Sequence, residues 1–254
     1  MTRDQTNSDW LHYLRKVELD CIIKRLPEKK EIKILEIGGG DGYQAKYLAD
    51  KGYDIISIDN YPKKPQIFEV QKKSVSKLDF PEEYFDVIIS SHVLQHIKEI
   101  DLAFHEMKKV LKKNGIMIHI VPTSYWTIIT GFLHYILLPK YYLEYRQRRK
   151  NKEQMEISIQ EDNYEKKNKM MDFIFLHPLG ENPSFIHELY YFSAYYWKKL
   201  FRKYGYDIVS FSKGPLFYSG HEILKMKVLN LRKLLAKISL TSSYCFTIKL
   251  AQYL

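Results

Sequence analysis

The sequence predicts an α/β protein built around a mostly parallel sheet. Short apolar runs typical of buried strands alternate along the chain with stretches in which apolar side chains recur at helical spacing. A glycine-rich turn, residues 38–42, follows the first of these runs directly. Alternation of this kind covers both faces of a parallel sheet with helices, and ligands then bind beyond the carboxyl ends of the strands.

The first half of the chain reads as a helix followed by a strand–helix–strand unit. Residues 9–26 carry apolar side chains at helical spacing up to Pro27, and we expect this helix to form a lid or a flank. The run 32–37 enters the glycine turn and is followed by a helix that stops at Gly52. A second buried strand, 54–59, completes the unit.

The same alternation continues further along the chain. A strand at 86–91 precedes a helix around 103–111, and Gly115 introduces a strand that ends at Pro122. After residue 192, Ser193 is placed to cap a helix that precedes a strand at 206–212, and a last strand is expected at 243–250. Residues 123–192 interrupt the pattern as an insertion.

With 254 residues, the chain is long enough for one large domain with a sizeable core. We therefore expect a single domain, 1–254, in four parts: an N-terminal helix (1–30), a cofactor-binding core (31–122), an insertion or lid (123–192) and a C-terminal part with a basic amphipathic segment (193–254).

The cysteine content and the N-terminal residues favour the cytoplasm as the compartment. Cys21 and Cys245 are too few for a disulfide framework or a thiolate metal site, so we expect no metal and a reducing, cytoplasmic environment. The N-terminus, MTRDQTNSDW, lacks the apolar stretch of a secretory signal.

The basic charge is unevenly distributed. The formal net charge is +10, which fits nucleic acid, an anionic membrane or an acidic substrate, but also a lysine-rich codon usage with no specific partner. Residues 140–152 hold six basic side chains against Glu144, and residues 221–254 hold six against Glu222.

The glycine turn predicts a nucleotide site without choosing the nucleotide. Gly38, Gly40 and Gly42 let the backbone approach a ligand, and the following helix presents free N–H groups. The dinucleotide pattern G-x-G-x-x-G/A can also be threaded through Gly40, Gly42 and Ala45. Asp59 at the end of the second strand fits a ribose, or else a turn residue before Pro62.

Four ordered motifs together carry a family resemblance. These are E-x-G-x-G-x-G from Glu36, the second strand ending in Asp59, the segment LDFPEEYFDVIISSHVLQHI, and FHEMKKVLKKNGIMIHIVP. They resemble class I S-adenosylmethionine-dependent methyltransferases over residues 31–122, and HELYYFSAYYWKKLFRKYGYDIV is similar to a later helix and strand of that fold. The resemblance implies a Rossmann-like, seven-stranded methyltransferase sheet with a helical insertion after the fifth strand, and S-adenosylmethionine as cofactor.

The resemblance also implies roles for single residues. Glu36, Gly38 and Gly40 would surround the methionine part, and Asp59 would accept hydrogen bonds from the ribose, with Asn60 beside the adenine. The family commonly has an Asp that binds the adenine amine where this sequence has Ser74 and Val75, so a backbone contact would replace it. Ser91 and His92, after the fourth strand, would line the bottom of the cofactor pocket.

Three outcomes stay open for the chemistry. A hydroxyl acceptor benefits from a general base, and histidine suits neutral pH. His187, before the last helix of the core, and His96, in VLQHI, are the candidate catalytic residues; a mechanism without a base is the third outcome. His119, in the middle of a strand, is expected to be a core residue.

The insertion and the tail suggest a membrane surface. Residues 114–139 contain no charged side chain, but Pro122 leaves only residues 123–138 for a helix, short of the roughly 20 residues needed to span. Apolar segments beside the basic stretches, 123–152 and 221–240, fit peripheral contact at the inner face of a membrane, or else a substrate lid and a solvated helix. The second half is also similar to bacterial methyltransferases associated with surface polysaccharide synthesis.

The sequence therefore predicts a methyltransferase, with O-methylation of a small-molecule, glycan or lipid-linked acceptor. An RNA methyltransferase is one alternative, although no N-P-P-Y-like tetrad follows the fourth strand and nucleic acid is not the expected partner. A cofactor-binding pseudo-enzyme that acts as a membrane-associated partner is the other.

Overall fold

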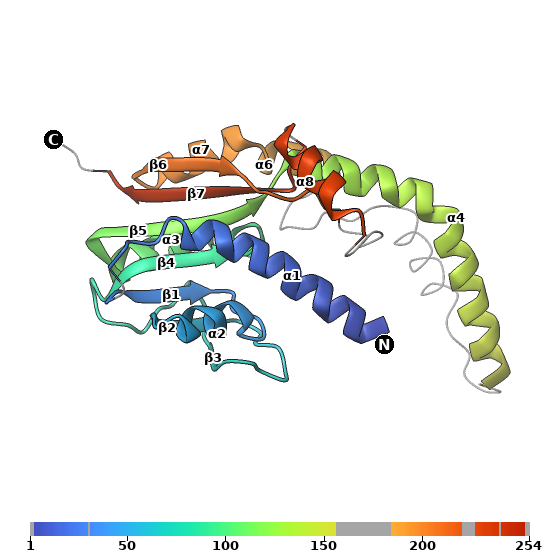
Figure 1. Ribbon diagram of the computed structural model, residues 1–254, viewed down its shortest axis with the longest axis horizontal. Coiled ribbons are helices and arrows are strands. Elements are labelled where there is room, and N and C mark those ends of the chain that lie inside the picture. The colour runs from blue at the N-terminus through green and yellow to red at the C-terminus, as the bar shows by residue number, and fades with distance from the viewer. Residues whose placement is uncertain (1–2, 30, 156–183, 220–226, 239, 252–254) are drawn as a thin grey trace.

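The structure is a computed structural model that describes residues 3–29, 31–155, 184–219, 227–238 and 240–251. Seven strands form one sheet in the order β3-β2-β1-β4-β5-β7-β6 (Figure 1). The strands are β1 (Lys33–Ile37), β2 (Asp54–Asp59), β3 (Val70–Lys72), β4 (Phe85–Ser91), β5 (Leu111–Pro122), β6 (Tyr206–Lys213) and β7 (Ser243–Leu250).

The sheet is parallel apart from one strand. β7 runs antiparallel between β5 and β6, while the pairs from β3 across to β5 are all parallel. This confirms the predicted α/β class, and β2 and β7 have the predicted bounds. The local sequence does not predict the short strand β3, because Val70 is its one buried side chain and leaves no apolar run to detect.

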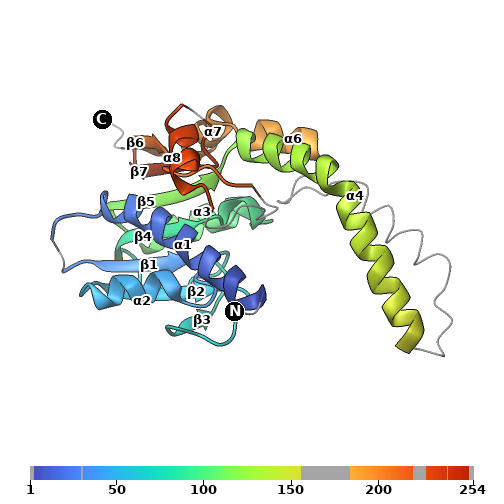
Figure 2. The same cartoon turned by 45° about the vertical axis from the view of Figure 1, so that its right-hand side comes forward.

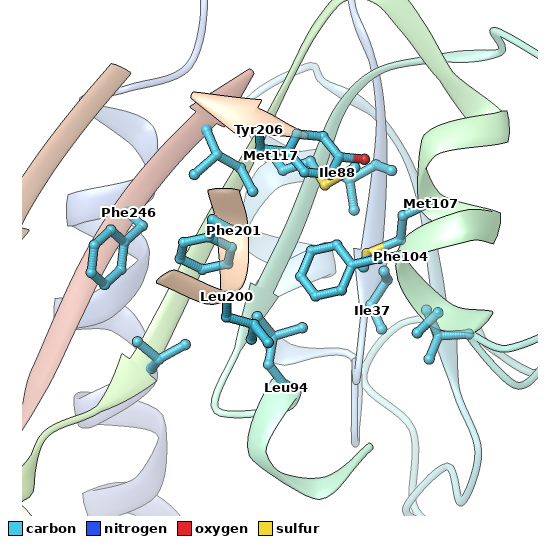
Figure 3. Packing of buried hydrophobic residues seen from close by; sticks show 14 of the residues in the cluster. Ile37, Ile88, Leu94, Phe104, Met107, Met117, Leu200, Phe201, Tyr206 and Phe246 are labelled. Atoms are coloured by element: carbon cyan, nitrogen blue, oxygen red, sulfur yellow. The ribbon is translucent and has the colours of Figure 1, made fainter. Parts of the chain in front are cut away.

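Helices cover both faces of the sheet. On one face, α3 (Ile100–Val110) and α7 (Ala194–Lys203) bury an aromatic cluster in which Phe201 lies between Phe104 and Phe246 of β7 (Figure 3). On the other face, α1 (Arg3–Ile23) and α2 (Tyr43–Asp50) pack their apolar side chains on β1, β4 and β5. Alternation along the strands sends successive residues to opposite clusters, so Ile34 joins the α1 face and Leu35 the α7 face.

Local signals explain where the α7 helix begins. The side chain of Ser193 accepts a hydrogen bond from the backbone N–H of Tyr196 at 3.1 Å, which satisfies a free donor of the first turn. The helix then buries Trp197, Leu200 and Phe201 on one face. The predicted cap is therefore confirmed.

The insertion contains one long helix. α4 (Ser124–Met155) starts just after β5, runs through Pro139 and bends along its length (Figures 1 and 2). An internal proline removes one backbone hydrogen bond and kinks a helix rather than always ending it. Within the described residues, no helix is long and apolar enough to cross a membrane.

The tail differs from its prediction at one residue. Arg232 in α8 (Leu229–Lys237) is one of the tail's six basic residues, which were expected at a membrane surface or on a solvated helix, but its side chain is 4% exposed. Its guanidinium lies over the ring of Trp10 and its Nε donates to the carbonyl of Phe217 at 2.7 Å. Part of the tail, residues 220–226, lies outside the described residues.

Candidate active site

A cavity of about 800 Å³ opens at the carboxyl ends of β1, β2 and β4, where the parallel fold places ligands. Most predicted site residues line it: Gly38, Gly40, Asp59, Asn60, Ser74, Val75, Ser91, His92 and His96. A volume of this size lies within the range of small-molecule and cofactor sites, about 300–1,000 Å³. α1 contributes Leu11, His12 and Arg15 to the wall.

The glycine turn forms one side of the cavity. Its backbone has positive φ angles, which residues with a side chain rarely adopt. Gly38 and Gly40 have φ of +80° and +61°. A Cβ on Gly38 would meet Val93 at 2.1 Å, whereas a Cβ on Gly40 would meet nothing within 4 Å. Gly38 is thus required by packing, and Gly40 leaves open space beside the cavity.

Asp59 holds this turn from the end of the neighbouring strand. Its Oδ2 accepts the N–H of Gly40 at 2.9 Å, and its Oδ1 accepts the N–H of Tyr61 at 2.8 Å. A carboxylate offers about four acceptor positions. Each oxygen of Asp59 therefore keeps capacity for a further donor, such as a ligand hydroxyl.

Glu36 lies behind the glycine turn and is not among the cavity-lining residues. The residue is 2% exposed, and its Oε2 accepts a hydrogen bond from the hydroxyl of Ser57 at 2.6 Å. Oε1 is buried and has no hydrogen-bond partner. Burial raises the pKa of Glu36 to about 7. An unpaired, buried carboxylate oxygen is costly, so this atom suits a cationic donor brought in by a ligand.

A second buried carboxylate, Glu18 of α1, collects four donors. Its Oε2 accepts from Arg15 at 2.8 Å and from the hydroxyl of Ser91 at 2.9 Å. Its Oε1 accepts the hydroxyl of Tyr218 at 2.8 Å and lies 2.7 Å from Nε2 of His92. Although burial opposes ionisation, the charges of His92 and Arg15 hold the pKa of Glu18 well below its usual range.

The contact with Glu18 sets the orientation and tautomer of His92. An ionised carboxylate only accepts, so Nε2 of His92 carries the proton in this contact. Nδ1 is the ring nitrogen that this contact does not involve. His92 also has a φ of +56°, an uncommon conformation for a histidine, and its backbone N–H donates to Ile120 at 2.8 Å. Strained residues of this kind concentrate at functional sites.

The structure separates the other histidines. His96, at the end of the short 3-10 helix η1 (Leu94–His96), lines the cavity with His92. His187 in α6 (Phe185–Tyr191) does not line it: this histidine is exposed, and its Nδ1 lies 2.7 Å from the hydroxyl of Ser184. His119 is fully buried beside Ser90, as expected of a core residue, and burial lowers its pKa to about 3.

Glu18, Arg15 and Tyr218 were not identified from the sequence. One signal for Glu18 is present, because it stands in the helical row Trp10, Leu14, Glu18 and Ile22, whose other members are buried. A carboxylate on the core face of an amphipathic helix indicates a buried partner. Tyr218 offers no comparable signal, since it is 200 residues from Glu18 in the chain.

The sheet order and the position of the cavity define a class I S-adenosylmethionine-dependent methyltransferase. A family model described as a methyltransferase domain matches residues 10–211. The chain therefore belongs to the methyltransferase-domain family, and S-adenosylmethionine is the cofactor of this class.

Comparison with known proteins agrees on the fold. A ubiquinone biosynthesis O-methyltransferase of Pelagibacter ubique is 35% identical over 98 residues, which cover 35% of this chain and 41% of the relative. The match thus spans less than half of that relative.

Two solved structures share the fold at low identity. A putative S-adenosylmethionine-dependent methyltransferase of Listeria monocytogenes is 12% identical with a TM-score of 0.53, covering 94% of this chain and 100% of the other. A putative methyltransferase of Haloferax volcanii, solved with the Trm112 activator, is 13% identical with a TM-score of 0.55, covering 99% and 94%.

Proposed function

We propose that the protein transfers a methyl group from S-adenosylmethionine to a hydroxyl oxygen of a small-molecule acceptor. The observation that carries this proposal is the position of His92, which lines the cavity with its Nε2 against the buried Glu18. The similarity of residues in this chain to an O-methyltransferase of ubiquinone biosynthesis supports the choice of oxygen. The acceptor class includes phenols, glycans and lipid-linked hydroxyl compounds.

The residues of the cavity fit the cofactor. The backbone of Gly38 and Gly40 would lie beside the methionine part of the cofactor. The ammonium group of that methionine part would donate to the unpaired Oε1 of Glu36 behind the turn. Asp59 would accept the ribose hydroxyls with its remaining lone pairs. Asn60, Ser74 and Val75 would surround the adenine.

The methyl transfer needs two things: the acceptor must be positioned against the methyl group, and the acceptor hydroxyl must lose its proton. The sulfonium of the cofactor supplies an electrophilic methyl group, and holding acceptor and methyl in contact accounts for much of the rate, roughly 7–11 kcal/mol. Nδ1 of His92 would accept the proton of the acceptor hydroxyl, and Glu18 would stabilise the resulting imidazolium. His96 remains a second candidate base from the same side of the cavity, and His187 remains one outside it.

The test is a product analysis with isotope-labelled S-adenosylmethionine. The protein is incubated with separate panels of phenols, glycans and lipid-linked hydroxyl compounds, and methylated products are identified by mass spectrometry. A methyl ether supports the proposal. A product methylated on nitrogen or carbon, or cofactor binding without transfer to any hydroxyl panel, contradicts it. His187→Ala in the same assay tests whether that exposed histidine takes part.

A further inference from the structure

The helix α4 carries a row of exposed apolar side chains along one face. At 100° per residue, the positions of its members all fall within about a third of the helix circumference. We call this row the α4 stripe: Tyr125, Ile128, Phe132, Tyr135, Ile136, Tyr142 and Leu143, each between 41% and 62% exposed. An apolar face of this length on a soluble domain marks an interaction surface.

The stripe faces away from the rest of the domain. Trp126, Thr127 and Thr130, on the other side of the first turns, are buried against the body of the protein. Beyond these turns α4 projects from the sheet (Figures 1 and 2). No side chain from the described part of α4 or α6 lines the cavity.

Charge distinguishes between the surfaces that could cover the stripe. Lys140 and Arg146 are exposed on the same helix, and the sequence continues with Arg148, Arg149, Lys150 and Lys152. A second copy of the chain would place like charges opposite these cations, and two chains of net charge +10 repel each other. An anionic lipid surface attracts them instead, and aromatic side chains such as Tyr125 and Tyr142 suit the interface between lipid and water.

We propose that the α4 stripe docks the protein reversibly on an anionic phospholipid surface. The apolar side chains enter the boundary between headgroups and acyl chains, while the basic residues contact the headgroups. α4 begins two residues after β5, whose carboxyl end lies at the edge of the sheet where the cavity opens. The stripe therefore starts close to that edge of the sheet. This inference does not depend on which atom the enzyme methylates.

The test is flotation of the full chain with vesicles of phosphatidylcholine alone and of phosphatidylcholine mixed with phosphatidylglycerol. We expect retention only on the mixed vesicles, weakened by added salt. Phe132→Glu combined with Ile136→Glu should remove retention. Leu102→Glu combined with Val209→Glu changes two comparably exposed apolar residues elsewhere, on α3 and β6, and should leave retention unchanged.

Further measurements keep the proposal falsifiable. Arg146→Glu leaves the apolar stripe intact and should lower retention about tenfold. Binding of S-adenosylhomocysteine by every variant checks that each is folded. Absence of retention by the wild-type protein, or equal retention of the stripe variant, overturns the proposal. A dimer in light scattering that becomes a monomer in the stripe variant also overturns it, because a second copy then covers the stripe.

Discussion

Nε2 of His92 lies 2.7 Å from Oε1 of Glu18, and this contact joins the residue after β4 to α1 across 74 residues of chain. The N-terminal helix is therefore more than a cover, because it supplies the carboxylate that orients a cavity-lining histidine. Tyr218 adds a third segment to the same contact, with its hydroxyl 2.9 Å from Nε2 of His92. The contacts around His92 therefore depend on three segments that are far apart in the chain.

The first prediction concerns His92 and Glu18. His92→Asn should lower kcat by about 100- to 10,000-fold, because it removes a general base. Asparagine tolerates positive φ better than most residues, so the fold should survive. Glu18→Gln should also lower kcat, through loss of the charge that stabilises the imidazolium. Steady-state kinetics with an identified acceptor measures both; a larger loss from His187→Ala than from His92→Asn would contradict the assignment.

The second prediction concerns pH and Glu36. The pKa of about 7 in the folded protein exceeds the unfolded value of about 4.3, so the folded state keeps a proton that the unfolded state has released. The stability linked to this proton is then fully present below pH about 4 and is lost as pH rises to about 7, by about 4 kcal/mol in total. Glu36→Gln should remove this loss, raising Tm at pH 8 relative to the wild type, as thermal unfolding would show.

The same variant should bind the cofactor poorly. An ammonium group beside Glu36 favours the ionised carboxylate, so the affinity of the wild type for S-adenosylhomocysteine should rise between pH 6 and pH 8, roughly either side of the shifted value. Glu36→Gln should show weak binding and no such rise. Unchanged affinity in the variant would show that the cofactor makes no contact with this carboxylate.

Part of this architecture could be predicted from the sequence. The strand β7 and the Ser193 cap rest on local patterns, an apolar run and a serine before a helical row, and both are confirmed. The course of α4 through Pro139 was not predicted, because a proline can kink a helix as well as end it. The burial of Arg232 was not predicted, because charge alone does not reveal the ring of Trp10 over which it lies.

The site divides in the same way. Nine of the eleven predicted site residues line one cavity, because the glycine turn and the ends of parallel strands meet at one edge of the sheet. Glu36 lies behind that lining and His187 on the surface. The contacts of Glu18 depend on the crossing of α1 over the sheet, and no local pattern specifies that crossing.

A third prediction uses two glycines that share a backbone conformation. Gly40 and Gly52 have φ of +61° and +88°, and a Cβ on either would meet nothing within 4 Å. Gly40→Ala and Gly52→Ala should each destabilise the fold by about 1 kcal/mol. Only Gly40→Ala should weaken the binding of S-adenosylhomocysteine, because Gly40 lines the cavity whereas Gly52 does not. Equal loss of binding in both variants would attribute the effect to stability alone.

The central claim is that the cavity beside Asp59 binds S-adenosylmethionine, and calorimetric titration with S-adenosylhomocysteine tests it most directly. The comparison is between the wild type, Asp59→Ala, and Asp54→Ala, which removes a carboxylate from the opposite end of the same strand. NAD serves as the alternative nucleotide. We predict binding of S-adenosylhomocysteine by the wild type and by Asp54→Ala, its loss in Asp59→Ala, and no binding of NAD. A folded wild-type protein that binds NAD, or that binds neither ligand, would contradict the account.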